Sequence, residues 1–222
     1  GTAVVTSGTL YTNASNSKTL DSLSGGTFAF TNANAGSNKT VTVSGVTVND
    51  GNSGNNYTVT YANNTTSTID KATLTIRAVT DTKTYTGTTA SSATPTYTGL
   101  VAADSDKLTG LTQVFNSANV NGIDGSTLSV NNYSLNSSVS NNYNVITKTA
   151  TGTINQLAEV TYTGVSGGNW SDPINWGSGS TAGAIPTLNN VATVIIPSGK
   201  TVIYNKDQLN SLTTTSNISN YG

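Results

Sequence analysis

The chain repeats a set of short phrases at a nearly constant spacing. The matching pairs are 30–34 with 115–119 (FTNAN and FNSAN), 55–57 with 141–143 (NNY), and 68–69 with 153–154 (TI). The offset of about 85 residues is the size of one small β-sandwich domain. We therefore expect two tandem domains of one fold, in residues 1–71 and 72–157.

The first domain is shorter than the second at its start. Residues 10–13 align with 96–99, and residues 1–2 align with 87–88. The strand expected at 72–86 (ATLTIRAVTDTKTYT) therefore has no counterpart in the first domain. A sandwich without one strand has an unpaired edge, which is a template for a strand from another segment or chain.

Alternation of apolar and polar residues with period two predicts strands at 39–43, 57–61 and 73–79. Clusters of Asn, Asp, Ser and Gly at 49–54 and 121–125 predict turns between strands. This spacing is typical of an all-β sandwich, and no window has the periodicity of a helix. The predicted fold class is all-β, with tandem Ig-like β-sandwiches followed by a smaller β-module.

The smaller module occupies residues 158–222, which do not follow the repeat. Residues 191–196 (VATVII) and 200–204 (KTVIY) flank a Pro-Ser-Gly turn and predict a β-hairpin. Residues 209–218 are consistent with a closing strand or with the first rung of a β-solenoid. The module is therefore expected to be a hairpin or the start of a β-solenoid.

The repeated NNY phrase has a structural interpretation. Two Asn residues suit the left-handed backbone of a turn before a strand. The Tyr then begins that strand, with its ring buried and its hydroxyl hydrogen-bonded. Contact with a ligand is the alternative.

Composition excludes several kinds of chemistry. The 222 residues include no His, Cys or Met, so thiol, haem and Ser-His-Asp sites lack their residues. A net charge of −1 argues against a nucleic-acid partner. No apolar run approaches the roughly 20 residues of a membrane span, and the opening residues lack the basic start of a signal peptide. We expect no enzyme activity, and any secretion signal would lie outside this chain.

Two Trp residues in the smaller module are candidates for glycan stacking. Trp170 and Trp176 lie six positions apart among Gly, Pro and Asn, with Asp172 and Asn175 between them. A planar ring next to an amide or a carboxylate suits a pyranose. The alternative is that both rings hold the Gly-rich loop onto the hairpin.

Four acidic residues in predicted turns are candidates for a calcium site. Asp50 begins a stretch that resembles a calcium loop but lacks its closing Glu. Asp104 and Asp106 offer two carboxylates close together, and Asp124 lies in the turn of the second domain that corresponds to Asp50. Calcium is thus a possible cofactor, and a solvated turn is the alternative at each position.

Several of these phrases occur together in a known family. Residues 85–90 (YTGTTA) resemble the Tyr-Asp-Gly-Thr opening of the YDG repeat, and 54–59 (GNNYTV), followed by 68–69 and 74–76, resemble its end and the next start. The resemblance covers residues 1–157. Thr86 stands where the family has Asp, so no role of that Asp is carried over.

The resemblance implies a function for the chain. YDG and MBG-type Ig-like repeats occur in large secreted bacterial adhesins, many of them filamentous-haemagglutinin-like proteins of two-partner secretion. They are mainly stalk or spacer modules without catalytic residues. We expect a stalk or adhesion segment at the cell surface whose partner is a host or neighbouring-cell surface, with glycan as one possible ligand. The alternatives are a filament subunit, self-associating through its exposed strand edge, and a glycan-binding module.

Overall fold

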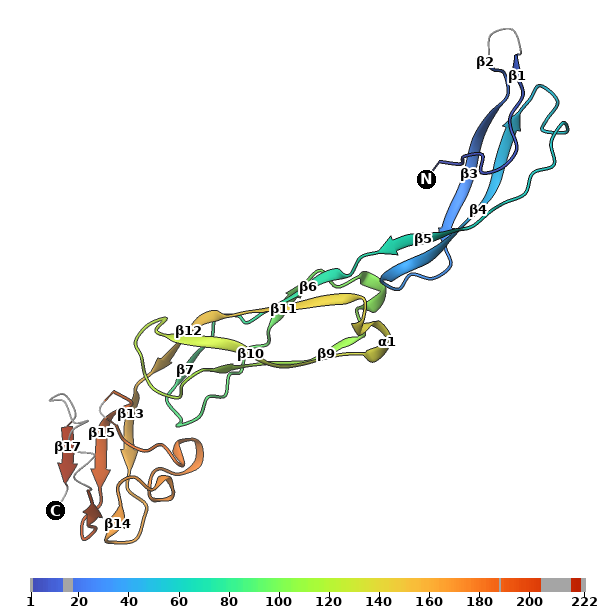
Figure 1. Ribbon diagram of the computed structural model, residues 1–222. Coiled ribbons are helices and arrows are strands. Elements are labelled where there is room, and N and C mark those ends of the chain that lie inside the picture. The colour runs from blue at the N-terminus through green and yellow to red at the C-terminus, as the bar shows by residue number, and fades with distance from the viewer. Residues whose placement is uncertain (1, 14–17, 188, 205–216, 221–222) are drawn as a thin grey trace. The chain divides into compact units, whose positions relative to one another are not determined.

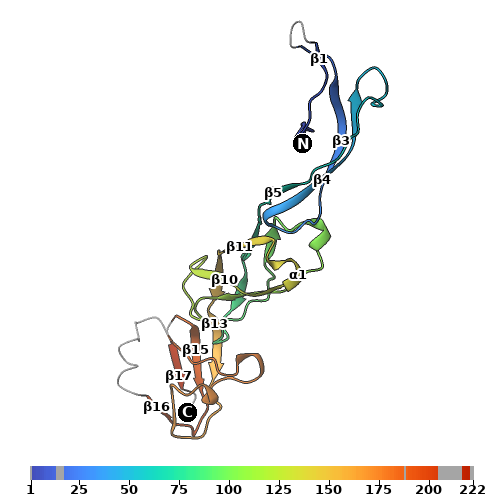
Figure 2. The same ribbon diagram turned by 45° about the vertical axis from the view of Figure 1, so that its right-hand side comes forward.

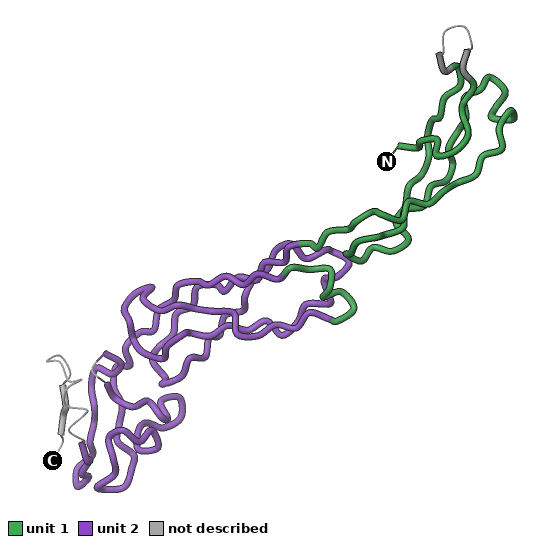
Figure 3. The backbone as a smooth tube through the Cα atoms, viewed as in Figure 1, with its two compact units in different colours: residues 1–72, 137–144 green, residues 73–136, 145–222 purple. Residues whose placement is uncertain are grey.

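The structure is a computed structural model that describes residues 2–13, 18–187, 189–204 and 217–220. It divides into two compact units, residues 1–72 with 137–144 and residues 73–136 with 145–222 (Figure 3). Regular structure is almost entirely β, which confirms the all-β class. Within the described part of the chain, no helix is long and apolar enough to cross a membrane.

Unit 1 contains the first domain, built on one antiparallel sheet with strand order β3-β4-β5. Its elements are β1 (Thr12–Asn13), β2 (Lys18–Thr19), β3 (Ser22–Phe30), β4 (Gly36–Asn49) and β5 (Asn64–Ile69), with α1 (Ser137–Ser140) from the second domain's sequence. β3 and β4 run side by side, from Ser22 opposite Asn49 to Phe30 opposite Val41 (Figure 1 and Figure 2).

The strand predicted at 57–61 is absent from the first domain, so that prediction is wrong. The corresponding residues of the second domain form β11 (Tyr143–Lys148), which pairs with β6 (Ala72–Arg77). The first domain has no strand equivalent to β6 among its described residues. Without a partner, the alternating sequence at 57–61 has no ladder of hydrogen bonds to join.

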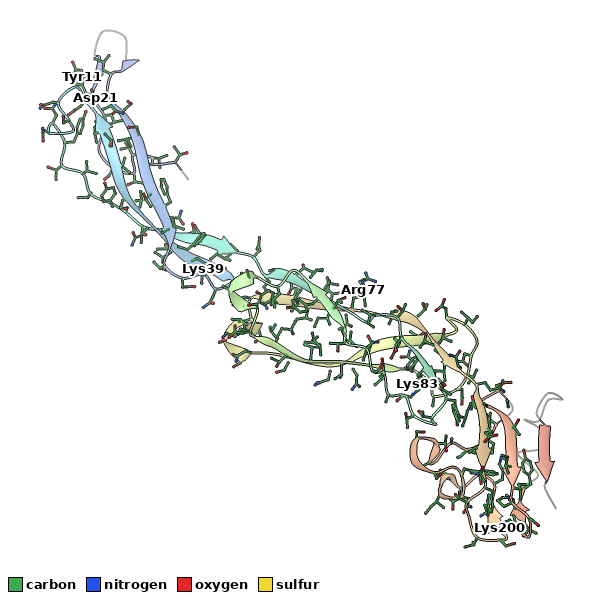
Figure 4. The ribbon with its side chains drawn as sticks, turned by 180° about the vertical axis from the view of Figure 1, so that it is seen from behind. Tyr11, Asp21, Lys39, Arg77, Lys83 and Lys200 are labelled. Atoms are coloured by element: carbon green, nitrogen blue, oxygen red, sulfur yellow. The ribbon has the colours of Figure 1, made fainter. Side chains whose placement is uncertain are left out.

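The hydroxyl of Tyr57 binds it to the end of the first domain that contains Tyr11 and Asp21. The Tyr57 hydroxyl donates to Asp21 Oδ2 at 2.5 Å and accepts from the Tyr11 amide at 2.8 Å. Tyr11 and Asp21 lie together at this end of the domain (Figure 4). The hydrogen bond with Asp21 is the main reason why the pKa of Tyr57 is raised. The bonded hydroxyl expected of the NNY phrase is therefore present here.

The second domain has two sheets, with strand orders β7-β12-β10-β9 and β11-β6-β8. Besides β6 and β11, its elements are β7 (Thr82–Thr84), β8 (Thr96–Thr98), η1 (Ala102–Asp104), β9 (Leu108–Phe115), β10 (Ser126–Leu135) and β12 (Ala150–Asn155). The two sheets form the layers that the repeat length predicts (Figure 1).

The segment predicted as one strand at 72–86 is two strands in different sheets. β6 pairs with β8, whereas β7 runs parallel to β12. The chain changes sheet at Val79, whose amide and carbonyl both bond to the buried side chain of Gln113, at 2.8 and 2.9 Å. This polar contact replaces the ladder bonds that the backbone loses where it crosses between the layers.

The strand pairs of the C-terminal module, in its described residues, are all parallel. Its elements are β13 (Leu157–Thr161), β14 (Gly168–Asn169), η2 (Pro173–Asn175), η3 (Gly179–Thr181), β15 (Val191–Ile196), β16 (Val202–Ile203) and β17 (Asn217–Asn220). β15 lies between β13 and β17, and β16 pairs with β14.

The predicted hairpin between residues 191 and 204 is therefore wrong, and the arrangement is that of a β-solenoid start. Leu157 lies opposite Val191, and Gly168 lies opposite Val202, so the same spacing relates both strand pairs. The turn at Pro197 directs the chain into a second sheet and not back along β15. Each strand thus stacks on the strand one rung earlier. Residues 209–216 lie outside the described residues.

Candidate functional site

Both Trp side chains lie inside the C-terminal module. Trp176 is 1 % exposed and Trp170 is 6 % exposed. Their rings meet edge to face at 4.7 Å, with Tyr162 against Trp176 and Tyr204 against Trp170. The indole N–H of Trp170 donates to Pro186 O at 2.9 Å, and that of Trp176 donates to Trp170 O at 2.6 Å. Neither indole presents a face on which a sugar could stack.

Asp172 and Asn175 shape the loop between the two Trp residues. Asp172 accepts from the Ile174 amide at 3.1 Å and so caps the short helix η2. Asn175 is buried and donates to Asn169 O at 2.9 Å. A Cβ atom on Gly164 would collide with the Asn175 side chain. These contacts give both polar residues a role in holding the loop.

A shallow, open hollow lies beside this loop. Its lining includes Gly164, Asn169, Asp172 and the exposed side chains of Val165 and Ile174. No aromatic ring lines it, so the stacking contact that motivated the glycan prediction is missing there.

The Asp50 carboxylate is occupied by its own turn. Oδ1 accepts from the amides of Asn52 and Gly54, both at 2.8 Å, and Oδ2 accepts from the Asn56 amide at 3.2 Å. The bond from Gly54 is the largest cause of the lowered pKa of Asp50. Amide donors stabilise the negative charge in the way that a cation would.

The other three predicted calcium ligands are not brought together with a further acid. Asp106 forms an ion pair with Lys107 at 2.6 Å, and Asp104 ends the short helix η1 nearby. Asp124 has a φ angle of 52°, and its amide donates to Thr153 Oγ1 at 2.9 Å. In the part of the chain that the structure describes, no group of three or more acidic residues could hold a metal ion.

Sequence reasoning missed a polar cluster around Asp81 in the second domain. Its carboxylate accepts from Ser91 Oγ at 2.6 Å, the Ser92 amide at 3.0 Å and the Thr82 amide at 2.8 Å. Burial raises the pKa of Asp81, but these hydrogen bonds outweigh burial and hold the pKa below its ordinary value. Ser91 Oγ also accepts from Gln113 Nε2 at 3.1 Å, so the cluster extends to the crossing at Val79.

Lys83 closes the loop that follows the strand β7 (Figure 4). Its Nζ donates to Thr88 O at 2.7 Å and to Ala90 O at 3.0 Å, and it lies 5.5 Å from the centre of the Phe115 ring. Burial is the main reason why the pKa of Lys83 is lowered. Asp81 and Lys83 thus both bond to backbone atoms of the segment that follows the strand β7.

The second domain and the C-terminal module share one hydrophobic core. The second domain contributes Phe115, Leu128 and Ile154, and the module contributes Tyr162 and Trp176. Only Gln156 separates the strands β12 and β13 across this boundary. The two parts therefore form one packed body, not two domains joined by a linker.

The first domain leaves the corresponding apolar face open. Phe30 pairs with Val41 as Phe115 pairs with Leu128. Phe30 is nevertheless 44 % exposed, whereas Phe115 is 1 % exposed. In the second domain the segment at 72–86 contributes Leu74, Ile76, Ala78 and Tyr85 to the buried interior.

A family model supports the repeat directly. The model of the YDG domain matches residues 1–67 and again residues 70–153. The chain belongs to the YDG domain family. No curated protein and no solved structure matches the chain.

The residues of the YDG phrase lie where the second YDG domain meets the C-terminal module. The Tyr85 hydroxyl donates to Ile185 O at 3.2 Å. Thr86, which replaces the Asp of the family phrase, shares a hydrogen bond of 3.0 Å with the hydroxyl of Thr88. Gly87 has a φ angle of 73°, and a Cβ atom there would lie 3.1 Å from Gly183 O. The phrase thus forms part of a junction between two modules.

Proposed function

We propose that this chain is a non-catalytic stalk or adhesion segment of a large secreted bacterial surface protein. Its YDG domains would space and orient other parts of that protein at the cell surface. The observation that carries the proposal is the core shared by the second YDG domain and the C-terminal module, with Gln156 alone between their strands.

This continuity makes the junction stiff. A junction with a buried core resists bending, because bending exposes apolar side chains to water at about 25 cal/mol per Å². A flexible linker would transmit position only as an average over many orientations. A segment without such a linker at residues 156–157 is suited to hold its neighbours in the parent protein at a defined distance and direction.

The experiment compares the chain with an unrelated tandem β-protein of equal length inside the parent surface protein. A stalk predicts that adhesion survives this replacement and depends on the number of modules. It also predicts that the isolated chain does not bind host cells or a glycan array. Loss of adhesion on replacement, together with binding by the isolated chain, would show that the segment itself recognises the partner.

The open face of the first YDG domain favours a second candidate, a filament subunit that accepts a strand from a neighbour. Phe30 is the observation behind it, since its counterpart Phe115 is fully covered. Analytical ultracentrifugation tests it, with and without a peptide of residues 72–86 added in trans. Oligomers that dissociate when the peptide is added would support strand donation, and a monomer at all concentrations would exclude it.

A further inference from the structure

Asn142 holds the end of the first YDG domain through three hydrogen bonds within unit 1. Its side-chain Oδ1 accepts from the Ala35 amide at 2.8 Å, and its Nδ2 donates to Asn34 Oδ1 at 3.2 Å. Its backbone carbonyl accepts from the Ala72 amide at 2.9 Å. One residue therefore binds both the loop between β3 and β4 and the start of the strand that leaves the domain.

Asn190 makes the same three contacts with the end of the second YDG domain. Its Oδ1 accepts from the Val120 amide at 2.7 Å, and its Nδ2 donates to Asn119 Oδ1 at 3.0 Å. Its backbone carbonyl accepts from the Leu157 amide at 2.8 Å. We call each bound pair, Asn34-Ala35 and Asn119-Val120, an Asn-x loop. We call the whole arrangement the amide clasp: one Asn forms two side-chain hydrogen bonds with an Asn-x loop and one backbone hydrogen bond with the strand that leaves the domain.

The bound residues are equivalent in the two domains. Asn34 and Asn119 stand at the end of the matching phrases FTNAN and FNSAN. Each has its amide bonded to the side chain two residues earlier, from Asn34 to Asn32 Oδ1 at 3.2 Å and from Asn119 to Ser117 Oγ at 3.1 Å. The two domains thus present the same preformed loop.

The residues that bind come from different folds. Asn142 belongs to a turn of a YDG domain, whereas Asn190 belongs to the parallel-stranded C-terminal module. The backbone N–H of each residue nevertheless donates to the carbonyl three residues earlier, from Asn142 to Val139 at 2.8 Å and from Asn190 to Thr187 at 3.0 Å. Both residues also come directly before a buried residue that begins a strand. Because two different folds make the same set of contacts, we infer that the hydrogen-bonding groups of the Asn-x loop determine how the clasp forms.

An Asn side chain is suited to this task because it combines one acceptor and two donors in one short planar group. An aspartate in its place could accept from the backbone amide of the second loop residue, Ala35 or Val120. Its carboxylate, however, has no proton to donate to the side-chain oxygen of the loop Asn. A longer Gln could keep both groups but not the backbone bond at the same distance.

Asn56 is the residue of the first domain that corresponds to Asn142 in the NNY phrase. Its side chain is exposed, and its Oδ1 accepts from Asn52 Nδ2 at 3.0 Å within its own turn. We propose that Asn56 is the third clasp residue and binds the Asn-x loop of a YDG domain placed before residue 1 in the parent chain. This inference rests on the proposed role of the chain as part of a tandem array.

The test uses the full chain with two N-terminal extensions. The short extension is a copy of residues 72–86, which completes the first domain. The long extension adds a copy of residues 72–156 before that, and so supplies an Asn-x loop in the correct place. Hydrogen exchange of the Asn56 side-chain amide is measured by NMR in all three proteins, with the Asn142 side chain as an internal reference.

We expect the Asn56 amide to exchange about tenfold more slowly with the long extension only, since one net hydrogen bond is worth about 1.4 kcal/mol at most. Asn56→Leu should then loosen the new junction, and Asn55→Leu should not. Asn34→Ala, which removes only the exposed acceptor, should release the Asn142 amide, and Asn141→Ala is its control.

Three results would overturn the inference. Slowed exchange with the short extension alone would assign the effect to completion of the domain. Equal exchange in all three proteins would show that no clasp forms. Self-association of the unextended chain that requires Asn56 would assign the surface to a second copy. A chain that itself binds host surfaces would contradict the stalk proposal and leave the clasp in place.

Discussion

The Tyr85 hydroxyl and the Ile185 carbonyl form a hydrogen bond of 3.2 Å between residues 100 positions apart in the sequence. Tyr85 is 6 % exposed and belongs to the core shared by the second YDG domain and the C-terminal module. Burial is the main reason why the pKa of Tyr85 is raised above its ordinary value. The family's own Tyr is thus a structural residue of the junction.

The first prediction concerns this bond. Tyr85→Phe removes the hydroxyl and leaves the Ile185 carbonyl without its donor, which should lower the free energy of unfolding of unit 2 by about 1 kcal/mol. Urea unfolding followed by Trp fluorescence measures the loss, because both Trp residues lie in the same core. Tyr97→Phe is the matched control, since Tyr97 is exposed and should change little. If Tyr97→Phe lowered the free energy of unfolding as much as Tyr85→Phe, the result would contradict a stabilising role of the Tyr85–Ile185 hydrogen bond.

The second prediction concerns Gly152, which lies close to the backbone of Asp81 in the second domain. A Cβ atom there would lie 2.7 Å from the Leu128 side chain, 2.8 Å from the Phe115 ring and 2.9 Å from Asp81 O. Gly152→Ala should therefore destabilise unit 2 by about 1–3 kcal/mol, the usual range for an overpacked core. Thermal unfolding measures the effect.

The control for Gly152 comes from the first YDG domain. Ser67 pairs with Lys39 there as Gly152 pairs with Ser126 in the second domain. Ser67 already carries a Cβ atom, and Asn64 Oδ1, which accepts from its hydroxyl at 3.0 Å, also accepts from the Thr66 amide at 2.9 Å, so Ser67→Ala should change the stability of unit 1 little. A large loss at Ser67 would mean that its hydrogen bond with Asn64 stabilises the first domain.

The third prediction is a gain in stability. Ser126 is 3 % exposed, and its Oγ has no hydrogen-bond partner among the described residues. Ser126→Ala removes a buried polar group without a bond, so it should raise the unfolding free energy by up to about 1 kcal/mol. Ser129→Ala breaks the 2.8 Å bond to Asn116 Oδ1 and should have no such benefit. A destabilised Ser126→Ala would show that the hydroxyl has a partner in solution.

The fourth prediction concerns acid stability. The pKa of Asp81 is lower in the folded protein than its ordinary value of 3.8, so the folded state binds the proton less readily than the unfolded chain. Asp81 therefore contributes stability above its unfolded pKa, and this contribution is lost as pH falls through the folded pKa. Asp81→Asn should flatten that part of the pH–stability curve. Unfolding midpoints measured between neutral pH and about pH 2 test this, and an unchanged curve would contradict it.

The sequence predicted the repeat, the all-β class and the bonded Tyr of the first NNY phrase. It failed where pairing depends on partners far along the chain. Residues 57–61 have the alternation of a strand but pair with no strand in the part of the chain that the structure describes. Residues 191–204 have the pattern of a hairpin, but their two strands, β15 and β16, each pair in parallel with an earlier strand. The Trp pair has a composition that suits a sugar site, but both rings are buried.

The sequence by itself determined the number of YDG domains, because the matching phrases recur at a constant spacing. It also determined which residues of a strand are apolar, because they alternate with period two. Only the tertiary structure decided which strands pair, which apolar faces are covered and what each Asn binds. Those outcomes depend on the residues that are brought opposite one another. Asn56 and Asn142 stand in the same phrase, but among the described residues it is Asn142 that binds an Asn-x loop.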